Sequence, residues 1–187
     1  ANDMVEILQT PTTLIDKSDS KLKVTNGEIS MDKITFTHDE GQGDTLFHDF
    51  SLDIKPGEKI GLVGASGSGK TTLTKLLLRF ADIDSGKITI DGQDISEVTQ
   101  ASLRAKIAYV PQEPLLFHRS VRENIAYGRP DATDAEIEEA AKKAGAYDFI
   151  VGLKDGFDTM VGERGINLSG GQRQRVAIAR AILKDAP

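Results

Sequence analysis

Apolar and polar residues alternate through much of the first half of the chain. Between residues 28 and 59 the apolar positions recur every second residue, at Ile34, Phe36, Phe50, Leu52 and Ile54. A period of two is typical of strands with one buried face, and a glycine-containing turn separates the two stretches. We therefore predict antiparallel strands in this region.

Three short segments, two of them apolar runs, predict further strands, because glycine or proline turns adjoin them. They are Ile60–Val63, Lys87–Ile90 and Ile107–Val110.

Apolar residues at helical spacing predict three helices. The first runs from Thr71 to Phe80, and a capping box at Thr133 opens the second, which ends near Gly145. The third runs from Ser169 to Lys184. The inner face of the first helix carries Leu73, Leu76, Leu77 and Phe80. The order of strand, glycine loop, helix, strand and helix indicates an α/β fold with a partly parallel sheet.

The first 26 residues are polar and mixed, which indicates a linker or strap. A helical start is possible at Met4–Leu8.

Composition narrows the class of protein. The chain has 187 residues with 39% hydrophobic and 28% charged residues, enough apolar content to build a core. No apolar run approaches the ~20 residues that span a bilayer. The absence of cysteine excludes disulfides and thiolate metal sites, and three scattered histidines make a zinc site improbable. A net charge of −6 argues against a general nucleic-acid binder.

A glycine-rich loop between the Ile60–Val63 run and the first helix carries the strongest chemical signal. Its residues fit the pattern G-x-x-x-x-G-K-[ST]: Gly64, Ala65, Ser66, Gly67, Ser68, Gly69, Lys70 and Thr71. The glycines let successive N–H groups point into one concavity at a helix N-terminus, where an anion is favoured. Lys70 would reach the β- and γ-phosphates, and the Thr71 hydroxyl is a hard oxygen ligand for Mg²⁺.

A second glycine pair, Gly170-Gly171, opens the last helix behind Ser169. A serine cap with two bare amides at a helix N-terminus suits an oxyanion. Taken alone, this segment is more often an ordinary helix cap than an anion site.

Together these motifs resemble the nucleotide-binding domain of ABC transporters. Leu168–Gln172, continued by Arg173-Gln174-Arg175, is similar to the family's signature motif, Gly64–Thr71 to its Walker A loop, and Val110–Glu113 to its Q-loop. The resemblance covers residues 28–187. It implies a P-loop NTPase (RecA-like) core with an antiparallel β-subdomain and a helical subdomain that carries the signature motif.

Two further segments resemble the exporter branch of the family. Val161–Gly165 is similar to the exporters' X-loop, and Ser120–Ile125 also follows their pattern. The resemblance implies that residues 1–27 are a linker from a transmembrane domain, and that residues 28–187 are a C-terminally incomplete nucleotide-binding domain. It also implies that Glu163 contacts intracellular loops.

The resemblance also implies roles in binding ATP and Mg²⁺. Residues Gly64 to Thr72 would hold the phosphates of ATP. Lys70 would contact the β- and γ-phosphates, Thr71 would bind Mg²⁺, and Gln112 would contact Mg²⁺ or the attacking water. Gln112 would also sense the membrane domain.

The signature motif would act across a dimer. Ser169 and Gly171, in the loop that also contains Gly170 and Gln172, would contact the γ-phosphate of ATP on the opposite subunit. Two nucleotide-binding domains, identical or different, would then enclose two nucleotides head to tail.

One position departs from the family pattern. His38 stands where the family usually has an aromatic residue that stacks on adenine. An imidazole can stack over a smaller area, and a surface histidine at a strand end is the alternative.

The family's Walker B aspartate, catalytic glutamate and switch histidine have no counterpart in these 187 residues. Phosphoryl transfer depends on positioned metal and oriented water. We therefore expect the full-length protein to be an ATPase, and this chain alone to bind ATP without turnover.

The resulting hypothesis is an exporter's ATP-binding domain at the cytoplasmic face of the cell (inner) membrane, attached to the membrane only through its transmembrane domain. One alternative is a soluble ABC-type ATPase in DNA repair or translation. The other is a generic P-loop kinase or GTPase, which the Leu168–Gln172 segment disfavours.

Overall fold

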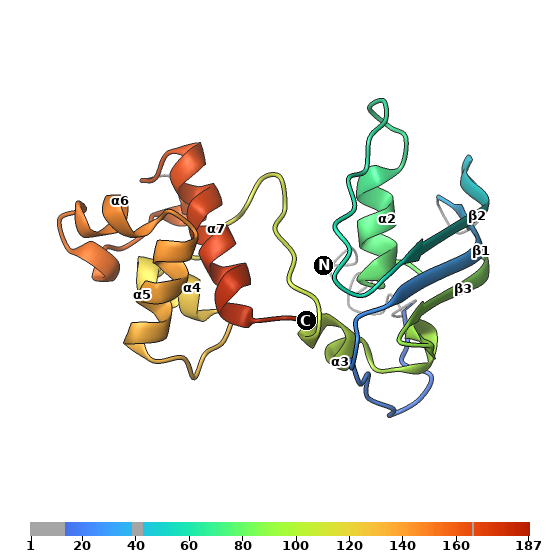
Figure 1. The fold of residues 1–187 in the computed structure, drawn as a ribbon. Coiled ribbons are helices and arrows are strands. Elements are labelled where there is room, and N and C mark those ends of the chain that lie inside the picture. The colour runs from blue at the N-terminus through green and yellow to red at the C-terminus, as the bar shows by residue number, and fades with distance from the viewer. Residues whose placement is uncertain (1–13, 39–42, 166) are drawn as a thin grey trace, which may run out of the picture. The chain divides into compact units, whose positions relative to one another are not determined.

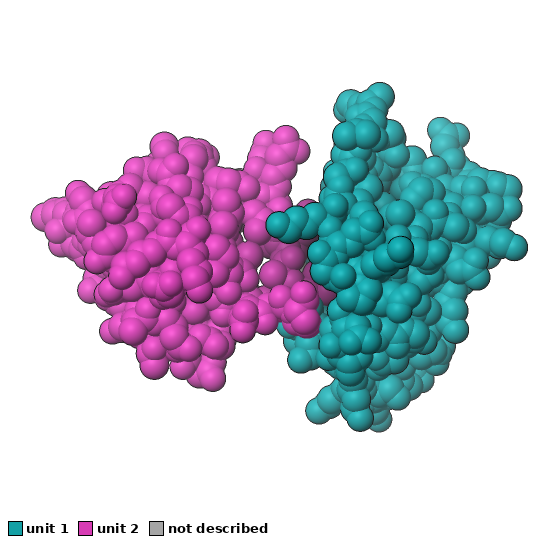
Figure 2. Space-filling model, viewed as in Figure 1, with its two compact units in different colours: residues 1–106 teal, residues 107–187 magenta. Residues whose placement is uncertain are grey.

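The computed structural model describes residues 14–38, 43–165 and 167–187. The chain divides into two compact units, unit 1 (residues 1–106) and unit 2 (residues 107–187), which are coloured separately in Figure 2. The possible helix at Met4–Leu8 lies outside the described residues.

Unit 1 is built on an antiparallel sheet (Figure 1) in the order β2-β1-β3-β4. Its strands are β1 (Ile29–Thr37), β2 (Thr45–Ile54), β3 (Ser85–Ile90) and β4 (Gln93–Asp94). The period-two prediction is confirmed, since Ile34 and Phe36 on β1 are both buried.

A glycine allows β3 to approach an irregularity in β1. The register shifts between Asp32 and Thr35, and Lys33 has a positive φ of 44°. Gly86 has a φ of +87°, and a Cβ there would lie 2.4 Å from the carbonyl oxygen of Lys33. Only glycine fits at this contact, so residue 86 helps to fix the register of β3.

The predicted strands Ile60–Val63 and Ile107–Val110 are wrong. Neither run pairs with any described strand, and every strand pair in the described residues is antiparallel. Val63 is 94% exposed and Tyr109 is 43% exposed. An apolar run becomes a strand only when a neighbouring strand bonds its N–H and C=O groups, and periodicity does not reveal that neighbour.

The first predicted helix is shorter than expected. Helix α2 spans Lys70–Leu77 and buries Leu73 and Leu76. Arg79 then adopts a left-handed φ of 50°, and the N–H of Phe80 donates to the carbonyl of Lys75. This turn takes Phe80 off the helix, so its ring is about half exposed rather than on the inner face.

The remaining elements of unit 1 are the 3₁₀ turn η2 (Ile95–Glu97) and helix α3 (Gln100–Ala105). The Thr99 side chain caps α3 by accepting from the N–H of Ser102.

Residues 14–28, here named the strap, contain neither helix nor strand before β1 begins, as predicted for a strap. The Asp91 carboxylate accepts hydrogen bonds from the backbone N–H groups at the C-terminal end of the strap, those of Thr25, Asn26, Gly27 and Glu28. The Thr25 N–H is the largest single cause that holds the pKa of Asp91 well below its usual range. Asp91 therefore fixes the chain where it enters the sheet.

Unit 2 is helical. It contains α4 (Val121–Ala126), α5 (Asp134–Lys143), α6 (Tyr147–Val151) and α7 (Gly170–Lys184), with 3₁₀ turns η3 (Gly156–Asp158) and η4 (Glu163–Gly165). Helix α7 packs against α4 and α5 over one apolar core. The predicted capping box at Thr133 and the predicted last helix are confirmed, and Val176, Ala179 and Leu183 of α7 are buried.

Among the described residues, no helix has both the length and the apolar character required to cross a bilayer.

Candidate functional site

The glycine-rich loop of unit 1 leads directly into α2. Gly69 is buried immediately before the helix with a φ of +91°, and a Cβ there would lie 2.8 Å from the Phe47 ring. A side chain at residue 69 would therefore push the helix away from β2. Glycine at this position sets both the backbone conformation and the close packing of the helix start on the sheet.

The N-terminus of α2 has no side-chain cap. Gly69 occupies the N-cap position, and no acidic residue lies in the first turn. The first N–H groups of a helix have no partner within the helix, and they form the positive end of its dipole. This helix start therefore favours an anion supplied from outside.

Lys70 adds a full positive charge to the loop. Its ammonium donates to the carbonyls of Gly64 (2.8 Å) and Ala65 (2.7 Å) and to the Ser68 hydroxyl (3.2 Å). Thr71, the next residue along the chain, is exposed and carries a hydroxyl. Amides, an ammonium and a hydroxyl, with no carboxylate in the loop, form a donor set that fits a polyphosphate and its Mg²⁺.

The glycine pair of unit 2 begins α7 in a different way. The Ser169 hydroxyl accepts from the N–H of Gln172 at 3.2 Å, and the Gln172 side chain accepts from the N–H of Ser169 at 2.8 Å. The structure thus uses the Gln172 side chain in a capping box. The exposed Gly170 and Gly171 lie inside this box. A Cβ at either would meet only the end of an arginine side chain, at 3.9 and 3.8 Å.

Two side chains on the first turn of α7, which sequence reasoning missed, hold the neighbouring loops. The Arg173 guanidinium donates to the carbonyl of Leu168 at 2.6 Å and packs against Gly165, and the Gln174 amide donates to the carbonyl of Pro111 at 3.5 Å. A cavity of about 450 Å³ lies beside them. Its lining residues are Gln112, Glu113, Pro114, Leu115, Gly170, Arg173 and Gln174. Unit 2 therefore places Gln112 and the start of α7 around one cavity.

A buried asparagine supports the loop that follows Gln112. Asn124 is fully buried, and its side-chain oxygen accepts from the N–H of Phe117 at 2.9 Å and from Arg180 at 3.1 Å. Arg180 also donates to the Asn124 carbonyl at 2.8 Å, and burial lowers the pKa of its guanidinium. The available signal for this anchor was an asparagine beside apolar residues in the Ser120–Ile125 segment.

The remaining candidate residues lie on the surface of their units. His38 is exposed at the end of β1, with its ring 5.2 Å from that of Phe36 in an edge-on contact. None of the described contacts joins His38 to the phosphate loop. Gln112 and Glu163 are exposed in unit 2. His48 lies in strand β2.

Comparison with known proteins identifies the family. The family model described as "ABC transporter" matches residues 47–187. The chain therefore belongs to the ABC transporter family, with the expected α/β class, antiparallel β-subdomain and helical subdomain around the signature segment. The kinase or GTPase alternative is wrong.

Individual relatives place the chain close to exporters. It is 54% identical over its whole length to an uncharacterized ABC transporter ATP-binding protein of Haemophilus influenzae, of which it covers 31%. It is 48% identical, over 97% of its length, to human ATP-binding cassette sub-family B member 6, of which it covers 22%. A solved bacterial Atm1-family ABC exporter with ATP bound superposes on the whole chain with a TM-score of 0.94 at 43% identity, and the chain covers 32% of that protein.

The chain thus spans about a fifth to a third of the length of these relatives.

Proposed function

We propose that this chain is the ATP-binding part of an ABC exporter. The observation that carries the proposal is the uncapped N-terminus of α2 behind a glycine loop that Lys70 lines with positive charge. The named exporters among the relatives, and the ATP bound in a solved structure of the same fold, support this choice. They favour export over a soluble role in DNA repair or translation.

In this proposal residues 64–72 hold the phosphates of ATP. The loop amides and Lys70 bind the β- and γ-phosphates, and Thr71 and Gln112 hold Mg²⁺, which neutralises phosphate charge. His38, at the end of β1, would present its exposed ring to adenine.

The start of α7 would complete the site of a second nucleotide-binding domain. Ser169, Gly170 and Gly171 are exposed, and the two glycines leave the backbone amides open to a phosphate group. Two domains would then pair head to tail, each closing on the ATP that the other holds.

Hydrolysis and export belong to the full-length protein. ATP binding would close the dimer and hydrolysis would reopen it, driving a transmembrane domain that residues 1–27 would join to residues 28–187. The nucleotide-binding part would face the cytoplasm beneath the cell membrane, and Glu163 would contact the membrane domain's intracellular loops.

Displacement of a fluorescent ATP analogue tests the binding proposal on the intact protein. Because the loop recognises phosphates, we expect Mg·ATP to displace the analogue at far lower concentration than AMP, which lacks the β- and γ-phosphates. Equal competition by AMP and ATP would overturn the assignment.

A further inference from the structure

The strap is bound to unit 1 along its length although it has no regular secondary structure. The Ser18 hydroxyl donates to the Glu97 carbonyl at 2.5 Å, and the N–H of Leu22 donates to the Ser102 hydroxyl at 3.0 Å. The Leu22 side chain is only 3% exposed. The strap is therefore a packed element of unit 1.

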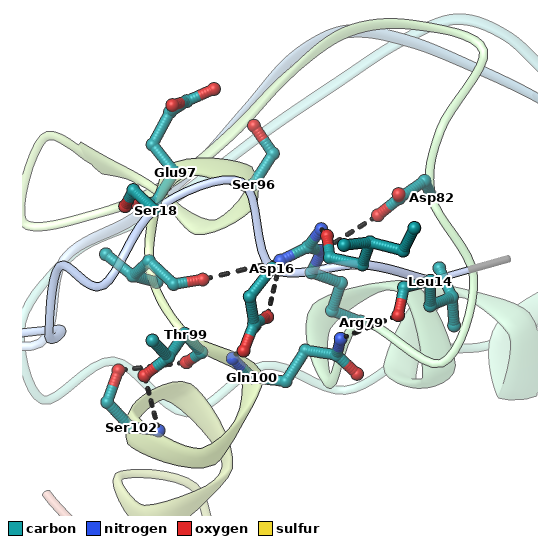
Figure 3. Close-up of polar contacts among 12 residues, drawn as sticks. Leu14, Asp16, Ser18, Arg79, Asp82, Ser96, Glu97, Thr99, Gln100 and Ser102 are labelled. Carbon is teal, nitrogen blue, oxygen red and sulfur yellow. Dashed lines mark hydrogen bonds and ion pairs between the residues drawn. The ribbon is translucent and has the colours of Figure 1, made fainter. Parts of the chain in front are cut away.

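A buried arginine lies where the strap meets the end of α2 (Figure 3). Arg79 is 1% exposed, and its guanidinium donates to the Asp82 carboxylate at 2.9 Å and to the Val98 carbonyl at 3.3 Å. It also donates to the carbonyl of Ile15 at 3.0 Å and to the Asp16 carboxylate at 3.5 Å, and both acceptors belong to the strap. The strap thus supplies half of the partners of this buried cation.

The same network reaches helix α3. The Asp16 carboxylate accepts from the N–H of Gln100 at 3.0 Å, and the Gln100 side chain donates to the Leu14 carbonyl at 3.2 Å. Arg104 of α3 donates to the carbonyl of Arg79 at 2.7 Å. The strap, the end of α2 and the start of α3 consequently form one hydrogen-bonded junction around Arg79.

Lifting the strap would leave part of the Arg79 guanidinium without partners in a buried position, which is unfavourable. Arg79 would then have to move or find new acceptors. It lies two residues beyond the end of α2, a helix of only eight residues whose other end is Lys70. Leu73 and Leu76 pack this short helix into the core of unit 1, and close-packed elements transmit strain, so a shift at Arg79 would be carried to the phosphate loop.

We infer that the strap and the phosphate loop are coupled through Arg79. The docked strap holds α2 where its N-terminus binds phosphate, and bound nucleotide in turn holds the strap against unit 1. Such coupling is reciprocal, because each event changes the free energy of the other by the same amount. This inference rests on the proposed nucleotide-binding function of the loop.

Two aspartates on the same guanidinium offer a matched test. Asp16 and Asp82 each pair with Arg79 and are similarly exposed, at 36% and 42%, but only Asp16 belongs to the strap. In the intact protein, Asp16→Ala should speed hydrogen exchange across residues 14–28 and weaken binding of a fluorescent ATP analogue roughly three- to tenfold. Asp82→Ala removes the 2.9 Å partner of the same guanidinium, so it should also weaken binding of the analogue. The strap would keep its own bonds to Arg79, so its exchange should change by less than twofold.

The reciprocal arm uses the unmodified protein. Mg·ATP should slow exchange across residues 14–28, and Lys70→Ala should abolish that protection. Coupling is overturned if Asp16→Ala frees the strap while affinity stays at the unmodified value, or if Mg·ATP binds without protecting the strap. Failure of the proposed function looks different, since the unmodified protein would then not bind Mg·ATP at all.

Discussion

Helices α2 and α7 both have glycine at the N-terminal end, at the N-cap of α2 and in the first turn of α7, yet the two helix starts are built in opposite ways. At α2 the N-cap residue is Gly69, no side chain caps the helix, and Lys70 lines the loop with charge. At α7 the side chains of Ser169 and Gln172 close a capping box. At the start of α2 no side chain caps the first amides, whereas the start of α7 is capped by side chains and presents bare glycine backbone. The first arrangement is suited to holding a ligand, and the second to closing on a ligand that another molecule holds.

The largest expected effect tests the proposed role of the start of α7 in closing on a ligand that another molecule holds. Ser169→Arg should abolish ATP-dependent dimerisation, because its long side chain would occupy the exposed position beside Gly170 and Gly171. Binding of ATP to the monomer should persist. Light scattering under non-hydrolysing conditions measures the first property and analogue titration the second. Ser169→Ala is the control: it removes the cap at a cost of about 1 kcal/mol in stability but adds no bulk. A dimer that forms normally with arginine at residue 169 would disprove the trans role.

The next effect concerns the charge at α2. Lys70→Ala removes charge-assisted hydrogen bonds worth ~1.5–3 kcal/mol, so ATP affinity should fall roughly tenfold to a hundredfold or more. Lys75→Ala, on the exposed surface of the same helix, should leave affinity unchanged. Titration with a fluorescent ATP analogue measures both variants. Equal affinity of the Lys70 variant and the unmodified protein would remove the phosphate-loop assignment.

A smaller expected effect is a difference in stability between alanine substitutions of the glycines at the two helix starts. Gly69→Ala should lower the free energy of unfolding by at least ~1–2 kcal/mol, because an L-residue is strained at a positive φ and the Cβ would contact the Phe47 ring. Gly171→Ala should leave stability unchanged or raise it by up to ~1 kcal/mol, since glycine is unfavourable inside a helix. Denaturant unfolding of the intact protein compares the variants. Equal destabilisation by both would show that the two starts are not built differently.

The smallest effect is a dependence on pH. The N–H of Ser120 lowers the pKa of Glu123, and the N–H of Thr133 lowers the pKa of Glu136. A lowered folded-state pKa means that these two capping boxes stabilise above the ordinary glutamate pKa of about 4.3, and that this contribution is lost as pH falls through the lowered values. The box at Ser169 uses an amide, which does not titrate.

Amide chemical shifts measure this difference. On acidification the N–H signals of Ser120 and Thr133 should move together with their glutamates, while the Ser169 signal stays constant. Movement of all three at the same pH would point to general acid unfolding and not to titration of the individual boxes.

Sequence patterns predict correctly those structural features that depend only on residues close together in the chain. The Thr133 capping box and the alternation in β1 each depend on a few consecutive positions, and the structure confirms both. The glycine loop before α2 is also a local pattern, and its role in binding phosphate stays a prediction. Strands at Ile60–Val63 and Ile107–Val110 were predicted from the same kind of pattern and are wrong. A strand also requires a neighbour, and the described residues supply none for these runs.

The junction around Arg79 could not be derived in this way. Its strap partners Ile15 and Asp16 lie more than 60 residues earlier in the chain. The available signal was a cation between the apolar residues Leu78 and Phe80, which calls for a buried partner without naming it. Asn124 is a similar case, since its bond to Arg180 spans 56 residues.

The long reach of the strap's hydrogen bonds also sets an order of folding. The bonds that join the strap to the rest of unit 1 connect residues 63 to 86 positions apart, whereas each capping box of unit 2 connects residues three positions apart. The entropy cost of closing a loop grows by about 0.6 kcal/mol with each doubling of its length, and non-local contacts slow folding. The helix starts of unit 2 should consequently form early. The strap should dock last, after β3 and the turn at Asp91 have brought its acceptors into place.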